Sequence, residues 1–242
     1  MKIATVQTKS IKGDIAANIT NHKKLINSCI SLQADAIFFP ELSLTGYEPK
    51  LAKELAIAKE DIRLEPFQEL SNRNTITVGV GLPTKSEYGI HISMIIFRPN
   101  LPKQIYHKQY LHDDELPYFV TGQDCNIITI NDIKVALAIC YESLQLAHFK
   151  KSIKLGAKYY LTSVAKSKKG VDHALKHYAK LAQQHSTPIL MCNSIGLCDT
   201  FESTGTSSIW NSKGKLIAQL DNINQGILIF DTQTEEVIRT QI

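Results

Sequence analysis

The chain has 242 residues, of which 43% are hydrophobic and 21% are charged. This composition argues against a disordered, fibrous or repeat protein, and the length allows a large core in one domain, so we expect residues 1–242 to form a single domain. The formal net charge is only +4 at pH 7, and the lysine cluster at 166–169 has no interleaved aromatic residue. We therefore expect no binding to nucleic acid and interpret the cluster as solvated surface.

The N-terminus and the cysteines indicate the cellular setting. Gln7, Lys9 and Lys12 interrupt the first apolar run too early for a secretion signal, and no stretch approaches the roughly 18 apolar residues of a membrane span. The cysteines are odd in number and scattered, which favours reduced thiols over a disulfide framework: Cys29, Cys125, Cys140, Cys192 and Cys198. We expect a soluble, cytoplasmic protein that does not bind membranes.

Apolar periodicity predicts strands interleaved with helices. In the first half, the expected elements are a strand at Lys2–Gln7, a helix at Asp14–Leu32 and strands at Ala36–Phe39, Thr75–Leu82 and Ile92–Phe97. In the second half, they are strands at Ile127–Ile130 and Lys134–Ile139, a helix at Leu144–Leu155, a strand at Lys158–Ser163, a helix at Val171–His185 and strands at Pro188–Cys192 and Gly226–Phe230.

Two of the strand-helix-strand passes look like weak copies of each other. The first joins "KIATVQ" to "ADAIFF" and the second joins "KVALAI" to "AKYYLTS". The pattern predicts an α/β fold in which two similar sheets form a sandwich.

Reactive side chains follow three of the predicted strands. Glu41 comes after "AIFFP", Lys108 after the short run "QIYH" and Cys140 after "KVALAI". Ligand sites in open α/β sheets gather at the carboxyl ends of strands. A single residue of this kind is more often plain surface or core, but the joint occurrence of all three predicts a reactive site.

The same three places carry a family resemblance. "FFPELSLTGY" (38–47), "YHKQYLHDDE" (106–115) and "LAICYES" (137–143) resemble, in order and spacing, the glutamate, lysine and cysteine blocks of the carbon-nitrogen hydrolase family, or nitrilase superfamily. The resemblance continues in "LMCNSIG" (190–196) and "STGTSSIWNSKGKLIAQL" (203–220), and so covers nearly the whole chain.

This resemblance implies a four-layer αββα sandwich and a Glu-Lys-Cys triad. Glu41 would be the base, Lys108 the stabiliser of the transition state and Cys140 the nucleophile. The auxiliary glutamate of the family would fall on Glu115. The resemblance also implies a homodimer or larger homo-oligomer.

The chemistry of such a site can be examined independently. A free thiol is only a few per cent ionised at pH 7 because its pKa is about 8.5. Glu41 and Glu115 beside Lys108 would leave a net charge of minus one, so we expect a neutral resting thiol that loses its proton as it attacks. Lys108 and the backbone N–H of Tyr141 would stabilise the oxyanion. No metal or organic cofactor is required.

The substrate is less well defined. Leu144 stands where many amidase and carbamoylase branches have an arginine, the residue best suited to bind a carboxylate. We expect Tyr47, Glu142 and Lys166 to contact a small linear amide or N-carbamoyl compound. Because no synthetase domain is attached, a glutamine-fed ammonia tunnel is not expected.

Other interpretations remain open at this point. They are a non-catalytic, partner-binding member of the same fold, a true nitrilase, and an isochorismatase-like cysteine hydrolase on another fold. His173 and His177 lie four apart on a predicted helix, but the zinc motif with an internal glutamate is missing, which favours a solvated face. The four cysteines other than Cys140 are interpreted as structural.

Overall fold

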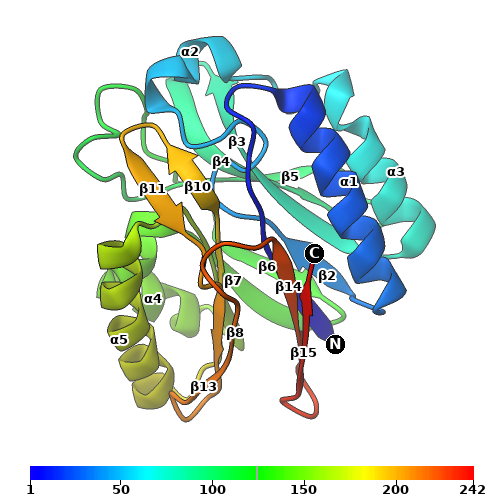
Figure 1. Cartoon of the computed structure of the whole chain (residues 1–242), viewed down its shortest axis with the longest axis vertical. Coiled ribbons are helices and arrows are strands. Elements are labelled where there is room, and N and C mark those ends of the chain that lie inside the picture. Colours follow the sequence, from blue (N-terminus) through cyan, green and yellow to red (C-terminus); the bar gives the residue numbers. More distant parts are fainter. Residues whose placement is uncertain (124) are drawn as a thin grey trace.

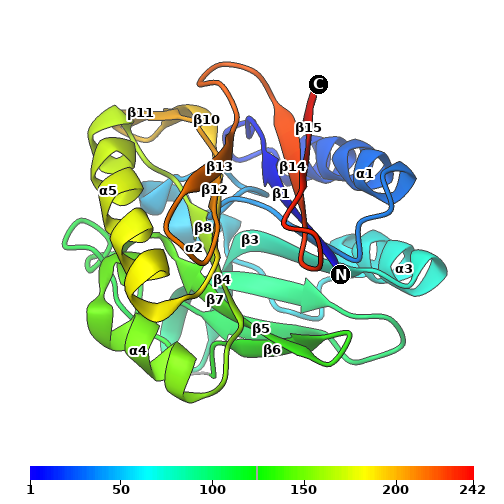
Figure 2. The ribbon, with the colours of Figure 1, turned by 90° about the horizontal axis from the view of Figure 1, so that it is seen from below.

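The computed structural model describes residues 1–123 and 125–242. Within this part of the chain, the first large sheet has the order β15-β14-β1-β2-β3-β4-β5. Its strands are β1 (Lys2–Gln7), β2 (Ala36–Phe38), β3 (Thr77–Ser86), β4 (Gly89–Phe97), β5 (Gln104–His107), β14 (Gly226–Asp231) and β15 (Val237–Gln241). Figure 1 shows β14 and β15 at the C-terminal end of the chain, and Figure 2 shows β14 beside the N-terminal strand β1, with which it pairs in antiparallel fashion.

The second large sheet has the order β13-β12-β9-β8-β7-β6 over the same described residues. Its strands are β6 (Ile127–Ile130), β7 (Ile133–Ile139), β8 (Tyr159–Val164), β9 (Ile189–Asn193), β12 (Ser208–Trp210) and β13 (Leu216–Gln219). A small hairpin of β10 (Ile195–Cys198) and β11 (Phe201–Thr204) projects beyond it.

Helices connect the parallel strands of both sheets. In the first sheet, α1 (Ile15–Ser31) joins β1 to β2, and α3 (Glu65–Asn74) joins β2 to β3. In the second, α4 (Leu146–Lys154) joins β7 to β8, and α5 (Lys168–His185) joins β8 to β9. The two passes that looked alike in the sequence are therefore equivalent crossovers in two sheets.

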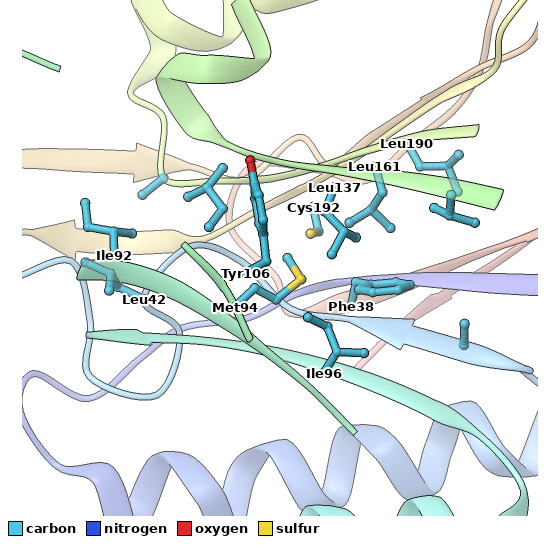
Figure 3. Close-up of a cluster of buried hydrophobic side chains, with 14 of the residues drawn as sticks. Phe38, Leu42, Ile92, Met94, Ile96, Tyr106, Leu137, Leu161, Leu190 and Cys192 are labelled. Carbon is cyan, nitrogen blue, oxygen red and sulfur yellow. The ribbon is translucent and has the colours of Figure 1, made fainter. Parts of the chain in front are cut away.

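The helices cover the outer faces and the sheets pack against each other, as Figure 2 shows. One apolar cluster fills the space between the sheets and includes Phe38, Met94, Leu137 and Leu161 (Figure 3). Two further clusters lie beneath the helices, one under α1 and α3 and one under α4 and α5. Because the central strands are buried on both faces, they are continuous apolar runs. The predicted αββα sandwich is confirmed.

Several elements differ from the sequence-based expectation. Helix α3 was not predicted because its sequence, EPFQELSNRN, offers only Phe67 and Leu70 as apolar anchors. Strands β10 to β13 and the edge strand β15 were also missed, since they are short or largely exposed. The short η1 (Pro49–Leu51), α2 (Ala52–Leu55) and η2 (Ile62–Leu64) lie in the connection before α3.

The cysteines are all free thiols. Cys29, Cys192 and Cys198 are buried, as expected for structural residues, but Cys125 is exposed and its assignment as a structural residue was wrong. In the part of the chain that the structure describes, no helix combines the length and apolar character needed to cross a membrane.

Candidate active site

The three reactive side chains meet where the two sheets face each other. Glu41 follows β2, Lys108 follows β5 directly, and Cys140 follows β7 and begins the short 3-10 turn η3 (Cys140–Leu144). The Lys108 ammonium lies 2.7 Å from Glu41 Oε1 and 2.6 Å from Glu115 Oε1. Lys108 and both carboxylates are buried. The structure therefore brings together residues that are far apart in the sequence.

The Glu41 segment is fixed from both sheets. Strand β3 passes so closely beneath it that a Cβ on Gly81 would lie 2.6 Å from the Pro40 carbonyl oxygen and the Leu42 nitrogen, which only glycine avoids. From the second sheet, the Ser163 hydroxyl donates a 2.7 Å hydrogen bond to the Phe39 carbonyl. Glu41 thus belongs to one sheet but is held against the other.

Lys108 is anchored by its own backbone and by two carboxylates. Its N–H donates to the Ile92 carbonyl at 2.9 Å, and its carbonyl accepts from the Gly122 N–H at 2.8 Å. Burial alone would lower the pKa of Lys108, but attraction by Glu41 and Glu115 raises it above its ordinary value. The side chain is therefore a permanent cation.

Glu115 is held by donors on three sides. Besides the Lys108 ammonium, the Tyr47 hydroxyl donates to Oε1 at 2.9 Å and the His112 N–H donates to Oε2 at 2.8 Å. Glu115 accordingly fixes the ammonium in place. The hydroxyl of Tyr47, expected to contact substrate, is engaged by Glu115, so only its ring is left to line the cavity.

Glu41 differs from Glu115 because one of its two carboxylate oxygens accepts no hydrogen bond from any described residue. Its Oε2 atom is buried and has no hydrogen-bond partner in the described residues. Burial raises the pKa of Glu41 above its ordinary value and the Glu115 charge adds to the shift, while the Lys108 charge opposes it. A buried carboxylate oxygen without a donor is poised to accept a proton.

Cys140 lies in a strained turn. Its φ is +47°, in the left-handed region that non-glycine residues seldom adopt and that occurs often at functional sites. Its Sγ atom lies 3.7 Å from Lys166 Nζ. Burial, reinforced by the Glu41 charge, raises the pKa of the Cys140 thiol to about 11. The added Lys166 charge brings the sum over Glu41, Glu115 and the two lysines to zero rather than the minus one expected from the sequence.

A cavity of about 510 Å³ opens onto Cys140. Of the residues predicted to bind substrate or to form the oxyanion hole, Tyr47, Tyr141 and Lys166 line it. His112, His173 and Phe201 also line it. Phe201 was not singled out from the sequence, whereas His173 is exposed, as expected for a solvated helix face, and borders the cavity as well. Cavities of about 640 and 600 Å³ elsewhere on the described surface are lined by none of the three reactive residues.

Glu142 does not line this cavity, and its predicted contact with substrate has to be corrected. The side chain is fully buried beneath the site. Its Oε1 accepts from the Tyr106 hydroxyl and the Ile139 N–H, and its Oε2 accepts from the Gln109 N–H, each at 2.6 Å. Figure 3 shows the Tyr106 ring within the inter-sheet cluster and its hydroxyl at the edge. The carboxylate thus connects the residue after Lys108 to the residue before Cys140.

Comparison with known proteins assigns the chain to a family. The family described as carbon-nitrogen hydrolase matches residues 2–241. The chain belongs to the carbon-nitrogen hydrolase family.

Individual members of the family resemble the chain at low sequence identity. A glutamine-dependent NAD(+) synthetase of Thermotoga maritima is 23% identical and aligns with 100% of this chain but only 44% of its own length. This carbon-nitrogen hydrolase therefore spans less than half of that relative. A probable nitrilase of Schizosaccharomyces pombe is 23% identical over 97% of this chain and 89% of its own length.

Among solved structures, the NitN amidase of Nesterenkonia sp. AN1 has a TM-score of 0.86 at 18% identity, covering 97% of this chain and 93% of the amidase. At this identity the likeness establishes the shared fold. Within the described residues of this carbon-nitrogen hydrolase, no group of three or more His, Cys, Asp or Glu side chains could hold a metal ion.

The resting state of the Cys140 thiol can be measured directly. Because burial and the Glu41 charge raise its pKa to about 11, we expect a neutral thiol at pH 7 that ionises only in strongly alkaline solution. The measurement is the ultraviolet absorbance of the thiolate as a function of pH, taken as the difference between the wild type and Cys140→Ala, which cancels the other cysteines. A titration midpoint well below pH 7 would contradict the expectation.

Replacing the Glu142 carboxyl group, whose pKa burial raises to about 7, with an amide should destabilise the fold above pH 7, where the carboxylate form predominates. In Glu142→Gln an amide N–H₂ would face either a backbone N–H or the Tyr106 hydroxyl, so a buried donor loses its acceptor. We expect the free energy of unfolding to fall by about 1–3 kcal/mol, the usual cost of such a group. Urea unfolding of this variant and of Glu202→Gln, an exposed matched control, checks it. Equal midpoints for the two variants would refute the connecting role of Glu142.

Proposed function

We propose that this carbon-nitrogen hydrolase cleaves the C–N bond of a small amide through a thioester on Cys140. The observation that carries the proposal is the buried oxygen of Glu41, which lacks a hydrogen-bond donor, beside a Lys108 ammonium and a strained cysteine at the end of a cavity. These groups supply a base, an electrophilic cation and a nucleophile.

The reaction would begin with proton transfer from the Cys140 thiol to Glu41 as the sulfur attacks the amide carbon. The negative charge that develops on the amide oxygen would be stabilised by Lys108 and the backbone N–H of Tyr141. Collapse of this intermediate breaks the C–N bond, and Glu41 returns the proton to the departing ammonia or amine. A water molecule, deprotonated by Glu41, then attacks the thioester and releases the carboxylic acid and the thiol.

The similar proteins support this chemistry. One structure of the amidase of Nesterenkonia sp. AN1, at TM-score 0.86 and 18% identity over 97% of this chain, shows the Michael addition of acrylamide at its active-site cysteine. The proposed nucleophile here, Cys140, is a half-buried thiol at the cavity wall. A compact amide is therefore the first class of substrate to test.

The side-chain amide of glutamine is a second candidate. It is favoured because several of the curated relatives are glutamine-dependent NAD(+) synthetases. Since the chain covers only 44% of each of these relatives, the match concerns one part of them.

Ammonia release from a panel of compounds tests the proposal. The panel contains small primary amides, N-carbamoyl compounds, glutamine and nitriles. We expect release from at least one primary amide, and a mass increase on the Cys140 peptide when the reaction is quenched early. Absence of release from every compound would favour a non-catalytic, partner-binding role, and turnover of nitriles alone would indicate a true nitrilase.

A further inference from the structure

The cavity wall carries a second lysine that the mechanism above does not use. Lys166 is only 6% exposed, lines the cavity and lies 3.7 Å from the Cys140 sulfur. The triad lysine, Lys108, is compensated by two carboxylates, whereas within the described residues no carboxylate lies within 4.0 Å of the Lys166 ammonium. Burial alone would lower the pKa of Lys166, but attraction by the Cys140 sulfur, Tyr178 and the more distant Glu41 raises it above its ordinary value, so the side chain remains a cation without a contact ion pair.

The other charges on the wall are already engaged. Glu115 accepts from Lys108, and Asp114 accepts from His112. Within the described residues the Lys166 ammonium has one hydrogen-bond partner, the Cys140 sulfur, and burial keeps that thiol neutral by raising its pKa to about 11. Lys166 is therefore a cation that faces an open cavity, and no carboxylate in the part of the chain that the structure describes is in contact with it.

The backbone of Lys166 is held firmly. Its N–H donates to Asn193 Oδ1 at 2.9 Å, and its carbonyl accepts from the Ser203 hydroxyl and the Thr204 N–H, each at 3.1 Å. Donors and acceptors from β9 and β11 thus fix the base of the side chain. Together with the burial of the side chain, this fixed backbone restricts the positions open to the ammonium, which lowers the entropy cost of binding an anion.

We propose that Lys166 binds a carboxylate of the substrate, so that the preferred substrate is a short primary amide with a carboxylate one or two carbons from the amide carbon. This inference rests on the proposed function. It specifies the class of substrate. Because Leu144 stands where many amidase branches have an arginine, the sequence showed no evident partner for a substrate carboxylate, and Lys166 would take that role.

The distances favour a short substrate. The Lys166 nitrogen lies 3.7 Å from Sγ. The amide carbon approaches the sulfur to about 3–3.5 Å before reaction, and a charge-assisted N–H···O bond spans about 2.8 Å. The carboxylate and the amide group can therefore reach the lysine and the sulfur at once across a spacer of one or two carbons.

The test compares malonamate with propionamide, which has a methyl group in place of the carboxylate. We expect the wild type to prefer malonamate in kcat/KM. Because an unpaired charge at a buried site is strongly rejected, we expect Lys166→Met to lower the malonamate-to-propionamide ratio by about 100-fold. Lys169→Met removes an exposed lysine from the same segment and should leave the ratio unchanged.

Binding without turnover separates this inference from the proposed function. Calorimetry should detect malonamate binding to Cys140→Ala and a loss of at least about tenfold in affinity in Cys140→Ala/Lys166→Met, as expected for a charged hydrogen bond. Failure to hydrolyse any amide would reject the proposed function while binding still decides the role of Lys166. An unchanged ratio, an equal loss for both amides, or no binding of malonamate would overturn the inference.

Discussion

Cys140→Ala is expected to abolish amide hydrolysis while leaving the fold in place. The sulfur is the only atom lost, and the half-buried side chain packs at the cavity wall rather than at the centre of the core. Without a nucleophile no thioester can form, and enzymes that lose their nucleophile drop in kcat by about 10,000-fold or more. Ammonia release from the best amide of the panel, followed over long incubation, measures the effect.

The exposed thiol Cys125 provides a matched control. Cys125→Ala removes the same atom from a site that is exposed and lies outside the three motifs, so its kcat should equal that of the wild type. Equal circular dichroism spectra would show that both variants are folded. Residual turnover by Cys140→Ala above a few per cent of the wild type would remove Cys140 from the mechanism.

The second large effect is expected in Lys108→Met, which should lose both activity and stability. The loss of an oxyanion donor typically lowers kcat by about 100- to 1000-fold. Methionine also leaves Glu41 and Glu115 buried with no cation between them, and breaking a buried ion pair from one side costs about 3–5 kcal/mol.

Two measurements separate the two effects. Urea unfolding gives the stability, and kcat determined well below the unfolding midpoint gives the activity of the folded variant. Lys176→Met, an exposed lysine on α5, is the control and should change neither. A folded Lys108→Met variant with a kcat within threefold of the wild type would show that the ammonium does not act on the reacting atoms.

The family and the layered architecture could be predicted because they depend on features that are local in sequence. The apolar runs that form β1, β2, β7 and β8 are continuous, since both faces of these strands are buried. Each reactive residue comes within three residues of a strand end: Glu41 after β2, Lys108 after β5 and Cys140 after β7. Their positions at strand ends therefore predicted that Glu41, Lys108 and Cys140 share one site, although the sequence contains no information on the distances between their side chains.

The contributions of Glu142 and Lys166 could not be predicted in the same way. Both follow a strand at similar offsets and both carry a charge, so the sequence assigned both to the substrate. The structure separates them by direction: Glu142 turns beneath the site onto backbone N–H groups, and Lys166 turns into the cavity. A side chain's orientation in an irregular turn depends on tertiary contacts that a linear pattern does not contain.

The placement of Glu41 on one sheet and Cys140 on the other has a consequence for how the protein loses function. No single segment of the chain sets the separation between the proposed base, Glu41, and the proposed nucleophile, Cys140; the apolar packing between the sheets and the Ser163 hydrogen bond set it. A small slip of one sheet over the other would separate the two groups while every helix and strand stayed intact. The rate of turnover should therefore report the alignment of the two sheets more sensitively than any measurement of secondary-structure content.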